Sequence, residues 1–278
     1  MACVSMLVQA SERVQMKLKM NIVDAFTQER FKGNSAAVIV TEDWLAPSLM
    51  QAIATENNLS ETAFLVQNQD GSYAIRWFSP ITEIDFCGHA TLASASVIFE
   101  THPQQQDIVF VAEAVGTMTV TRASDGRIEM DFPNRMPSLL EEVPDELVAG
   151  LSIPPIEVLR NCQAYFAVYQ HEDDVHALVQ TPEVLKKLAP YDVVATAKGK
   201  DYDFVSRYFW PANGGDEDPV TGSIHTGLAP FWSERLGKVE LVALQASSRT
   251  GVLYCDVSPT RVRVSGFAVP YLEGTITV

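Results

Sequence analysis

Residues 76–100 read RWFSPITEIDFCGHATLASASVIFE, and this stretch predicts the element around which the chain is built. An aromatic, β-type segment leads through a turn at Cys87-Gly88-His89 into a run of small residues that is typical of a buried helix. A glycine at such a junction lets a ligand approach the backbone, and the free N–H groups of the first helical turn face that ligand. The stretch therefore predicts an anion site at a helix N-terminus.

The same pattern occurs a second time at a nearly constant offset of about 130 residues. Arg207-Tyr208-Phe209-Trp210-Pro211 repeats Arg76-Trp77-Phe78-Ser79-Pro80. Further along, Thr221-Gly222-Ser223 takes the place of Cys87-Gly88-His89. The offset indicates a duplicated unit, and the two helix N-termini are expected to point into a cleft between the two halves.

The chain of 278 residues has room for two domains of ordinary size. Strand-like and helix-like segments recur in both parts, and the composition changes near Pro137. We therefore expect a flexible extension over residues 1–15, a first half over 16–133 that the C-terminal strand 267–278 is expected to join, and a second half over 134–266.

Composition and charge exclude several classes of protein. A hydrophobic share of 47% and a charged share of 20% are typical of a globular protein. The formal net charge of −15, without a cluster of Lys and Arg, argues against a nucleic-acid partner. No apolar run reaches transmembrane length and no basic segment precedes an apolar one at the N-terminus, so we expect a cytoplasmic protein with no membrane partner.

Local motifs exclude further chemistries. Four widely spaced cysteines form no CxxC pair, which argues against a zinc ribbon and against a disulfide scaffold. The sequence contains no GxGxxG, GxxxxGK[ST], GxSxG or HExxH, so nucleotide-binding, serine-hydrolase and zinc-protease functions have no support.

Two acids are candidates for chemistry, and each has a structural alternative. Glu61 falls within a β-like run between Ser60 and Thr62, where an exposed charge at the end of a strand is the ordinary explanation. Asp218 precedes Pro219 at what looks like the start of a helix. Its carboxylate is therefore expected to cap the helix, to serve the site, or to do both.

The turn before the first helix carries two further candidates. His89 would lie at the mouth of that helix, where the dipole favours the neutral imidazole, either as a proton carrier or as a structural hydrogen-bonded residue. Cys87 would have a lowered pKa at the helix N-terminus and could act as a base or nucleophile. Its counterpart in the repeat, Thr221, cannot take that role.

Four motifs in order resemble the PhzF family of phenazine-biosynthesis-like isomerases, from Lys17 to nearly the end of the chain. The resemblance implies an α+β fold shared with diaminopimelate epimerase. Such a fold has two pseudo-symmetric halves, each a mostly antiparallel β-sheet curled around a central helix, with the active site between them. The motifs are Asn58-Leu59-Ser60-Glu61-Thr62-Ala63-Phe64, Arg76-Trp77-Phe78-Ser79-Pro80, Cys87-Gly88-His89-Ala90-Thr91-Leu92-Ala93 and Glu217-Asp218-Pro219-Val220-Thr221-Gly222-Ser223.

Carried over position by position, the resemblance implies roles for individual residues. Glu61 would be the general acid/base, and His89 and Asp218 would line the same pocket. The family needs no metal and no organic cofactor, and a homodimer is expected from the same resemblance. The residues expected to bind the carboxylate substrate are Gly88, Gly222, Ser223, Thr221 and Cys87.

The reaction class follows from a comparison with the epimerases that share the fold. Those enzymes use one cysteine from each half, whereas Thr221 stands opposite Cys87 here, so Glu61 remains as the proton carrier. The expected function is that of a cofactor-independent isomerase that moves a proton in a small carboxylate, either dihydro-hydroxyanthranilate-like or amino-acid-like, by general acid/base catalysis. The alternatives are a one-base racemase or epimerase that uses Cys87, and a non-catalytic small-ligand-binding protein on the same fold.

Overall fold

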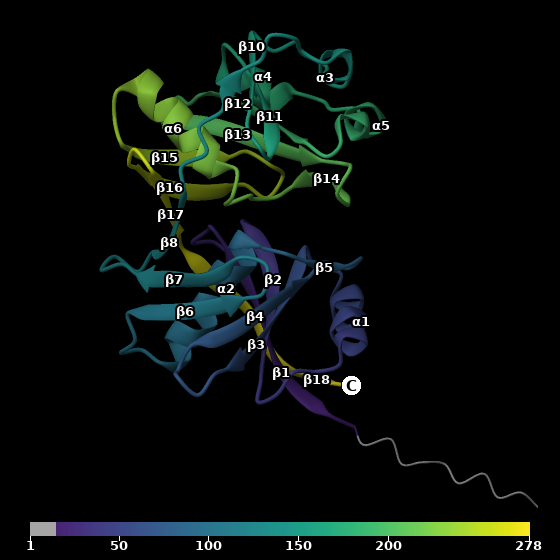
Figure 1. Ribbon diagram of the computed structural model, residues 1–278, viewed down its shortest axis with the longest axis vertical. Helices are drawn as coiled ribbons and strands as arrows, with labels where there is room; N and C mark the ends of the chain where they lie inside the picture. The colour runs from purple at the N-terminus through teal and green to yellow at the C-terminus, as the bar shows by residue number, and fades with distance from the viewer. Residues whose placement is uncertain (1–14) are drawn as a thin grey trace, which may run out of the picture.

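The computed structural model describes residues 15–278, so the extension predicted over residues 1–15 lies outside the described residues except for Gln15. Two lobes are stacked along the long axis of the molecule (Figure 1). All described strands belong to one hydrogen-bonded sheet that passes through both lobes. The predicted α+β architecture of two similar halves is confirmed.

The first half is a sheet whose strands pair in the order β18-β1-β2-β3-β4-β6-β7-β8. The pairs β2–β3 and β4–β6 are parallel and the others are antiparallel. The elements are β1 (Lys17–Ala25), β2 (Asn34–Thr41), α1 (Pro47–Asn57), β3 (Glu61–Gln67), β4 (Tyr73–Phe78), β5 (Glu83–Ile84), α2 (Gly88–Thr101), β6 (Asp107–Ala112), β7 (Gly116–Arg122), β8 (Ile128–Pro133) and β18 (Ala268–Thr277).

The second half repeats this arrangement in the order β9-β10-β11-β12-β13-β15-β16-β17, with β11–β12 and β13–β15 as the parallel pairs. The elements are β9 (Ser138–Leu139), α3 (Asp145–Ala149), β10 (Glu157–Arg160), β11 (Ala164–Val168), α4 (Glu172–Ala177), α5 (Pro182–Leu185), the 3-10 helix η1 (Lys186–Leu188), β12 (Asp192–Lys198), β13 (Phe204–Trp210), β14 (Gly215–Asp218), α6 (His225–Leu236), β15 (Glu240–Gln245), β16 (Gly251–Val257) and β17 (Arg261–Gly266).

Each half wraps its sheet around one buried helix. In α2 every residue from Gly88 to Phe99 is buried, and the helix packs against β1, β2, β3 and β8. In α6 the residues from His225 to Trp232 are buried against β15, β16 and β17. A helix that is apolar or small-sided all round has no solvent face, which explains why both sheets curl around their helices.

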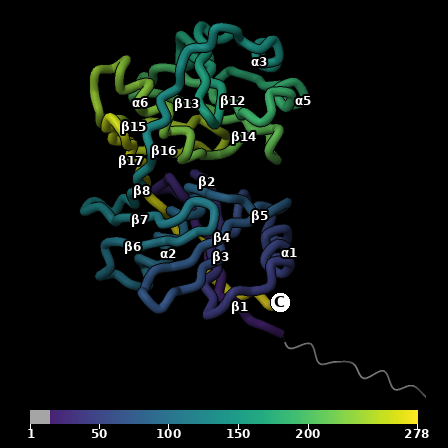
Figure 2. Tube along the Cα trace, in the orientation of Figure 1, coloured from purple at the N-terminus to yellow at the C-terminus, as the bar shows by residue number. Residues whose placement is uncertain are grey.

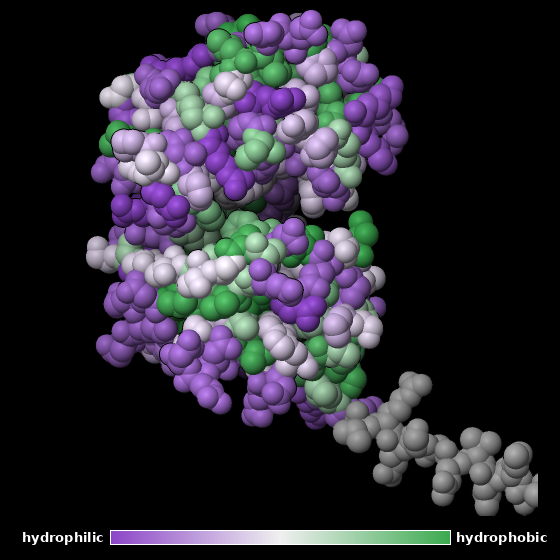
Figure 3. All heavy atoms as spheres, viewed as in Figure 1, coloured by the Kyte–Doolittle hydropathy of each residue, from purple (hydrophilic) through white to green (hydrophobic). Residues whose placement is uncertain are grey.

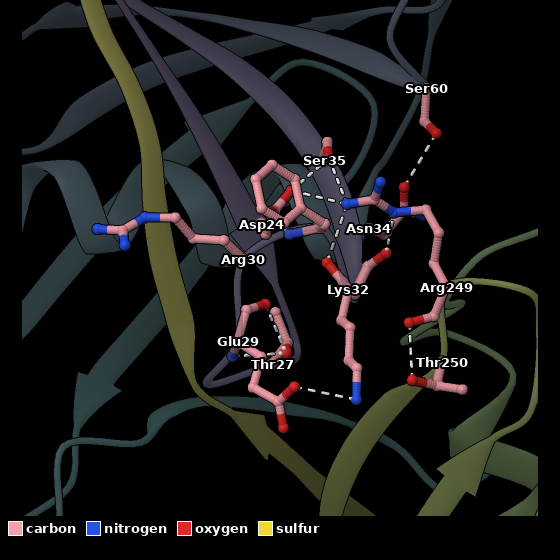
Figure 4. A network of polar contacts seen from close by, with 12 residues as sticks. Asp24, Thr27, Glu29, Arg30, Lys32, Asn34, Ser35, Ser60, Arg249 and Thr250 are labelled. Carbon is pink, nitrogen blue, oxygen red and sulfur yellow. Dashed lines mark hydrogen bonds and ion pairs between the residues drawn. The ribbon is translucent and has the colours of Figure 1, made fainter.

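The two halves are held together by strands and by an ion pair whose acid is buried. β8 pairs with β17 across the junction, and β18 returns to the first half, where it runs beside β1 (Figure 2). Arg249, in the β15–β16 loop of the second half, donates to Asp24 Oδ1 at 2.9 Å and to the Gly33 carbonyl oxygen at 2.9 Å (Figure 4). Asp24 also accepts a hydrogen bond from the Ser35 hydroxyl.

The division of the chain into residues 16–133 with 267–278, and residues 134–266, stays a proposal that this strand pairing supports. No element was predicted at β10 or α4, which are short. Within residues 15–278, none of the helices is long and apolar enough to cross a membrane.

Candidate active site

Glu61 is placed by the end of α1. Asn58 ends that helix in the left-handed conformation, with φ of 48°, and the chain then turns into β3, of which Glu61 is the first residue. The parallel pairing with β2 sets Glu61 opposite Ala36. The Glu61 side chain is 5% exposed, so the alternative of a solvated strand-end charge is wrong.

His89, the second residue of α2, faces Glu61. Its Nε2 lies 3.0 Å from Glu61 Oε2, and its Nδ1 lies 3.1 Å from Asn34 Nδ2. Nε2 is thus the ring nitrogen that faces Glu61, and Nδ1 faces Asn34. The two side chains therefore form a pair that can share a proton.

The electrostatics of His89 differ from the prediction. Burial opposes protonation of the ring, but the negative charges of Glu61 and Asp218 outweigh it and raise the pKa of His89 above its usual value. The helix dipole alone predicted a neutral imidazole. That prediction is wrong here, because the attraction of two nearby carboxylates for the protonated ring outweighs the effect of the dipole.

Asp218 comes from the second half, at the end of β14. Its Oδ1 accepts from Asn34 Nδ2 at 2.8 Å, and its Oδ2 accepts from the Thr221 hydroxyl. Burial raises the pKa of Asp218 to about 6, against the opposing influence of His89. The predicted helix cap is wrong, because α6 begins only at His225, and Asp218 instead connects the two halves.

Asn34 is the site residue that sequence reasoning missed. Besides its contacts with His89 and Asp218, its Nδ2 donates to the Val220 carbonyl oxygen at 3.0 Å, and its Oδ1 accepts from Ser60 Oγ at 2.9 Å (Figure 4). Asn34 is fully buried at the first position of β2. A lone asparagine after a glycine is normally explained by the turn, so the sequence carried no signal for this bridge.

The starts of the two central helices approach each other. A Cβ atom on Gly88 would lie 3.9 Å from the Cα of Gly222, and neither helix has a side-chain cap. Gly222 and Ser223 form a turn before α6, since their carbonyl oxygens accept from the N–H groups of His225 and Thr226. The two helix starts, one from each half, therefore bring their free backbone N–H groups close together, as the repeat predicted.

Thr221 is held in place by a buried glutamine of the second half. The Thr221 N–H donates to Gln245 Oε1 at 2.8 Å, and Gln245 Nε2 donates to the Asp218 carbonyl oxygen at 2.9 Å. Gln163 Nε2 lies 2.9 Å from Ser223 Oγ. These contacts fix the turn that carries the predicted substrate-binding residues.

Cys87 does not have the lowered pKa that its helix position predicted. The side chain is 6% exposed, and burial together with the charge of Glu61 raises the pKa of the thiol well above its usual value. Its Sγ lies 3.4 Å from His89 Nδ1. The thiolate that a cysteine base requires is therefore disfavoured.

Glu61, Cys87 and His89 also have a spacing that would suit one metal ion, because one ligand atom of each lies within 4.8 Å of the others. Without a cation, burial and the charge of Glu61 disfavour the thiolate form in which cysteine binds a metal. The same three groups are also close enough for proton transfer between neighbours.

The space between the halves is open beside these helix starts. Figure 3 shows the surface hollowed between the two lobes. A cavity of about 870 Å³ lies between the halves, in the size range of small-ligand sites. Its walls include Phe86, Thr91, Met118, Phe132, Ser223 and Thr226.

Comparison with known proteins identifies the class and the family of the chain. The fold and the relatives of the chain define the protein as an isomerase. The family model PhzC-PhzF, described as phenazine biosynthesis-like protein, matches residues 23–274, and the chain belongs to this family. An uncharacterized isomerase of Pseudomonas aeruginosa is 45% identical over 261 residues, covering 94% of this chain and 99% of the relative.

More distant relatives and solved structures extend the comparison. Phenazine biosynthesis-like domain-containing protein 1 of Mus musculus is 37% identical over 289 residues, covering 94% of this chain and all of the relative. The crystal structure of a PhzF family protein from Enterococcus faecalis has a TM-score of 0.90 at 41% identity, covering 95% of this chain and 100% of that one. A probable proline racemase from Agrobacterium radiobacter has a TM-score of 0.60 at 13% identity, covers 94% of this chain and 92% of its own, and shares the fold alone.

Proposed function

We propose that this isomerase moves a proton within a small carboxylate substrate by general acid/base catalysis, with Glu61 as the group that removes and returns the proton. The observation that carries the proposal is the pairing of Glu61 with His89. Glu61 Oε2 is buried 3.0 Å from His89 Nε2, so the two groups are within reach of a proton transfer. A carboxylate beside an imidazole can pass a proton to the ring and take it back.

His89 and Asp218 complete the proton-handling group. His89 has a raised pKa and adjoins Glu61, so it can supply or accept a proton as Glu61 changes state. Asp218 has a pKa of about 6 and can hold a proton near neutral pH. Asn34 links these two residues and keeps both side chains in place.

The starts of the two helices supply the binding site for the substrate carboxylate. Backbone N–H groups at Gly88 and at Gly222-Ser223 would hold it, with Thr221 and Cys87 beside them. The substrate would be dihydro-hydroxyanthranilate-like or amino-acid-like, and no metal or organic cofactor is needed for this chemistry. On the resemblance to the family alone, we also propose a homodimer.

The test is proton exchange in deuterated water, followed by NMR in the presence of a chelator. Trans-2,3-dihydro-3-hydroxyanthranilate is incubated with wild type, with Glu61→Gln and with the control Glu56→Gln. Glu56 lies exposed on α1, five positions before Glu61, so the control makes the same chemical change outside the site. We expect Glu61→Gln to lose about 100-fold or more in rate and the control to match wild type.

Exchange by Glu61→Gln at the wild-type rate would contradict the proposal. If wild type leaves this compound unchanged, the same assay is applied to amino-acid-like carboxylates. If wild type exchanges a carbon-bound proton in neither class of compound, the isomerase mechanism is refuted and a non-catalytic binding protein is favoured.

A further inference from the structure

The buried group of Glu61, Cys87 and His89 has the composition of a metal centre. It offers a carboxylate oxygen, a thiol sulfur and an imidazole nitrogen, which are the three kinds of side-chain atom that bind Zn²⁺ in proteins. All three side chains are buried, so water competes little for them. Within residues 15–278 no other group of His, Cys, Asp and Glu side chains has this spacing.

The distances between the three side chains suit a single ion. Glu61 Oε2 lies 3.0 Å from His89 Nε2, and Cys87 Sγ lies 3.9 Å from the same nitrogen. One ligand atom from each residue lies within 4.8 Å of the other two. Zinc bonds of about 2.0 to 2.3 Å place neighbouring ligand atoms of a tetrahedral site roughly 3 to 4 Å apart. Small side-chain movements therefore suffice to bring all three atoms onto one ion.

The charges around this group favour a cation. Besides burial, the negative charges of Glu61 and Asp218 act on both the Cys87 thiol and the His89 ring, and the pKa of each is raised. In the part of the chain that the structure describes, neither a lysine nor an arginine forms an ion pair or hydrogen bond with these four side chains. A divalent cation would offset both carboxylates and would stabilise the thiolate form of Cys87.

We infer that Glu61, Cys87 and His89 form a binding site for Zn²⁺ or a similar transition-metal cation, held through Glu61 Oε2, Cys87 Sγ and His89 Nε2. As the ion binds, the Cys87 thiol loses its proton to the solvent and a sulfur–metal bond forms, without oxidation or reduction. Three protein ligands leave the fourth position of a tetrahedral ion to water. A thiolate and an imidazole select Zn²⁺ over Mg²⁺ and Ca²⁺, which prefer oxygen ligands.

The bound ion would inhibit the enzyme rather than assist it. The proposed reaction needs no metal, and it needs Glu61 and His89 free to exchange a proton. An ion that occupies Glu61 Oε2 and His89 Nε2 takes the atoms that lie 3.0 Å apart and would pass that proton. This consequence rests on the proposed function, whereas the metal site itself does not.

The test uses Co²⁺ as a coloured substitute for Zn²⁺. The full chain carries Cys3→Ser and Cys162→Ser, so that Cys87 and the buried Cys255 are the only thiols left. Adding Co²⁺ should produce a thiolate-to-cobalt charge-transfer band, because a cysteine sulfur binds the ion. Zn²⁺ should displace Co²⁺ and abolish the band, whereas Mg²⁺ and Ca²⁺ at the same concentration should leave it unchanged.

Matched variants on this background identify the sulfur that binds the ion. Cys87→Ala should abolish the band and weaken Zn²⁺ binding about 100-fold or more in calorimetry, since a direct ligand contributes more than an outer-shell partner. Cys255→Ala removes the other buried thiol, in β16 of the second half, and should keep both the band and the affinity. Cys87→Ser keeps the size of the side chain and should also abolish the band, which covers the case in which Cys87→Ala does not fold.

Absence of the charge-transfer band, or a band that survives both replacements of Cys87, overturns the inference. A Zn²⁺ affinity that Cys87→Ala leaves unchanged overturns it as well. Inhibition is measured by proton exchange with Zn²⁺ added in place of the chelator, and exchange that continues at the same rate when Zn²⁺ fills the site refutes the inhibitory role. Failure of the proposed function has a different signature. If wild type exchanges no proton in the presence of chelator but shows the Cys87-dependent band, the isomerase mechanism fails and the metal site stands.

Discussion

Replacing Asp218 with asparagine is expected to stabilise the protein at alkaline pH, although Asp218 belongs to the candidate active site. Burial raises the pKa of this carboxyl from 3.8 to about 6 in the folded protein. Its charged form is therefore less favourable in the folded state than in the unfolded one. The rise in pKa corresponds to about 3 kcal/mol. When the carboxyl is ionised, wild type is less stable by this amount than it would be with an unperturbed pKa.

The sign of the pH dependence follows from the raised pKa. A carboxyl with a raised folded-state pKa contributes its stability in full below pH 3.8 and loses it as the pH rises through 6. The asparagine variant has no such loss. The difference in unfolding free energy, variant minus wild type, should therefore increase by about 2.4 kcal/mol between pH 4 and pH 8.

Urea denaturation at pH 4, 6 and 8 measures this difference for Asp218→Asn and for a control, Asp216→Asn. Asp216 is exposed two positions earlier, so its replacement should give a difference that does not change with pH in this way. The contacts from Asn34 and Thr221 can persist in the Asp218 variant, because an amide retains one acceptor and the hydroxyl can reorient. A difference that is constant from pH 4 to pH 8 would refute the reasoning.

Two further predictions concern the junction of the halves and the thiol. Arg249→Met should leave the 2% exposed Asp24 side chain without its cation and lower the unfolding free energy by about 3 kcal/mol in urea denaturation. Adding Asp24→Asn to this variant should restore part of the lost unfolding free energy. A double variant that is no more stable than Arg249→Met would contradict this explanation. Cys87→Ala should retain proton exchange at saturating substrate, with any loss confined to substrate affinity, because burial disfavours the thiolate that a cysteine base requires. A loss as large as that of Glu61→Gln would instead support a one-base racemase.

Local patterns sufficed to predict much of the fold. Lys17–Ala25 alternates polar and apolar residues, which is typical of a half-buried strand and matches β1, and a proline at the first helical position, Pro47, matches the start of α1. The repeated motif before Gly88 and Gly222 predicted two central helices with adjacent N-termini. These features depend on the spacing of residues close in sequence, which the chain displays directly.

The contacts between the halves could not be predicted in the same way. Asp218 was a candidate from the sequence, yet its local context suggested a helix cap, and only the structure brings it to Asn34 in the other half. The raised pKa of Cys87 depends on burial and on the charge of Glu61, which the fold places beside it from another element. Such effects depend on the registers of several strands at once, and those registers cannot be read from local patterns in the sequence.

The way in which the two halves differ bears on the reaction. His89 in the first half corresponds to Ser223 in the second, and Cys87 corresponds to Thr221, so the titratable members of both pairs lie in the first half. Racemisation with two bases requires a proton carrier on each side of the reacting carbon, which a serine and a threonine do not provide. A shift in which one carboxyl group removes and returns the proton requires a carrier on one side only. Under the proposed function, Thr221 and Ser223 are then free to bind and orient the substrate, while Asp218 is the residue of the second half that takes part in proton handling.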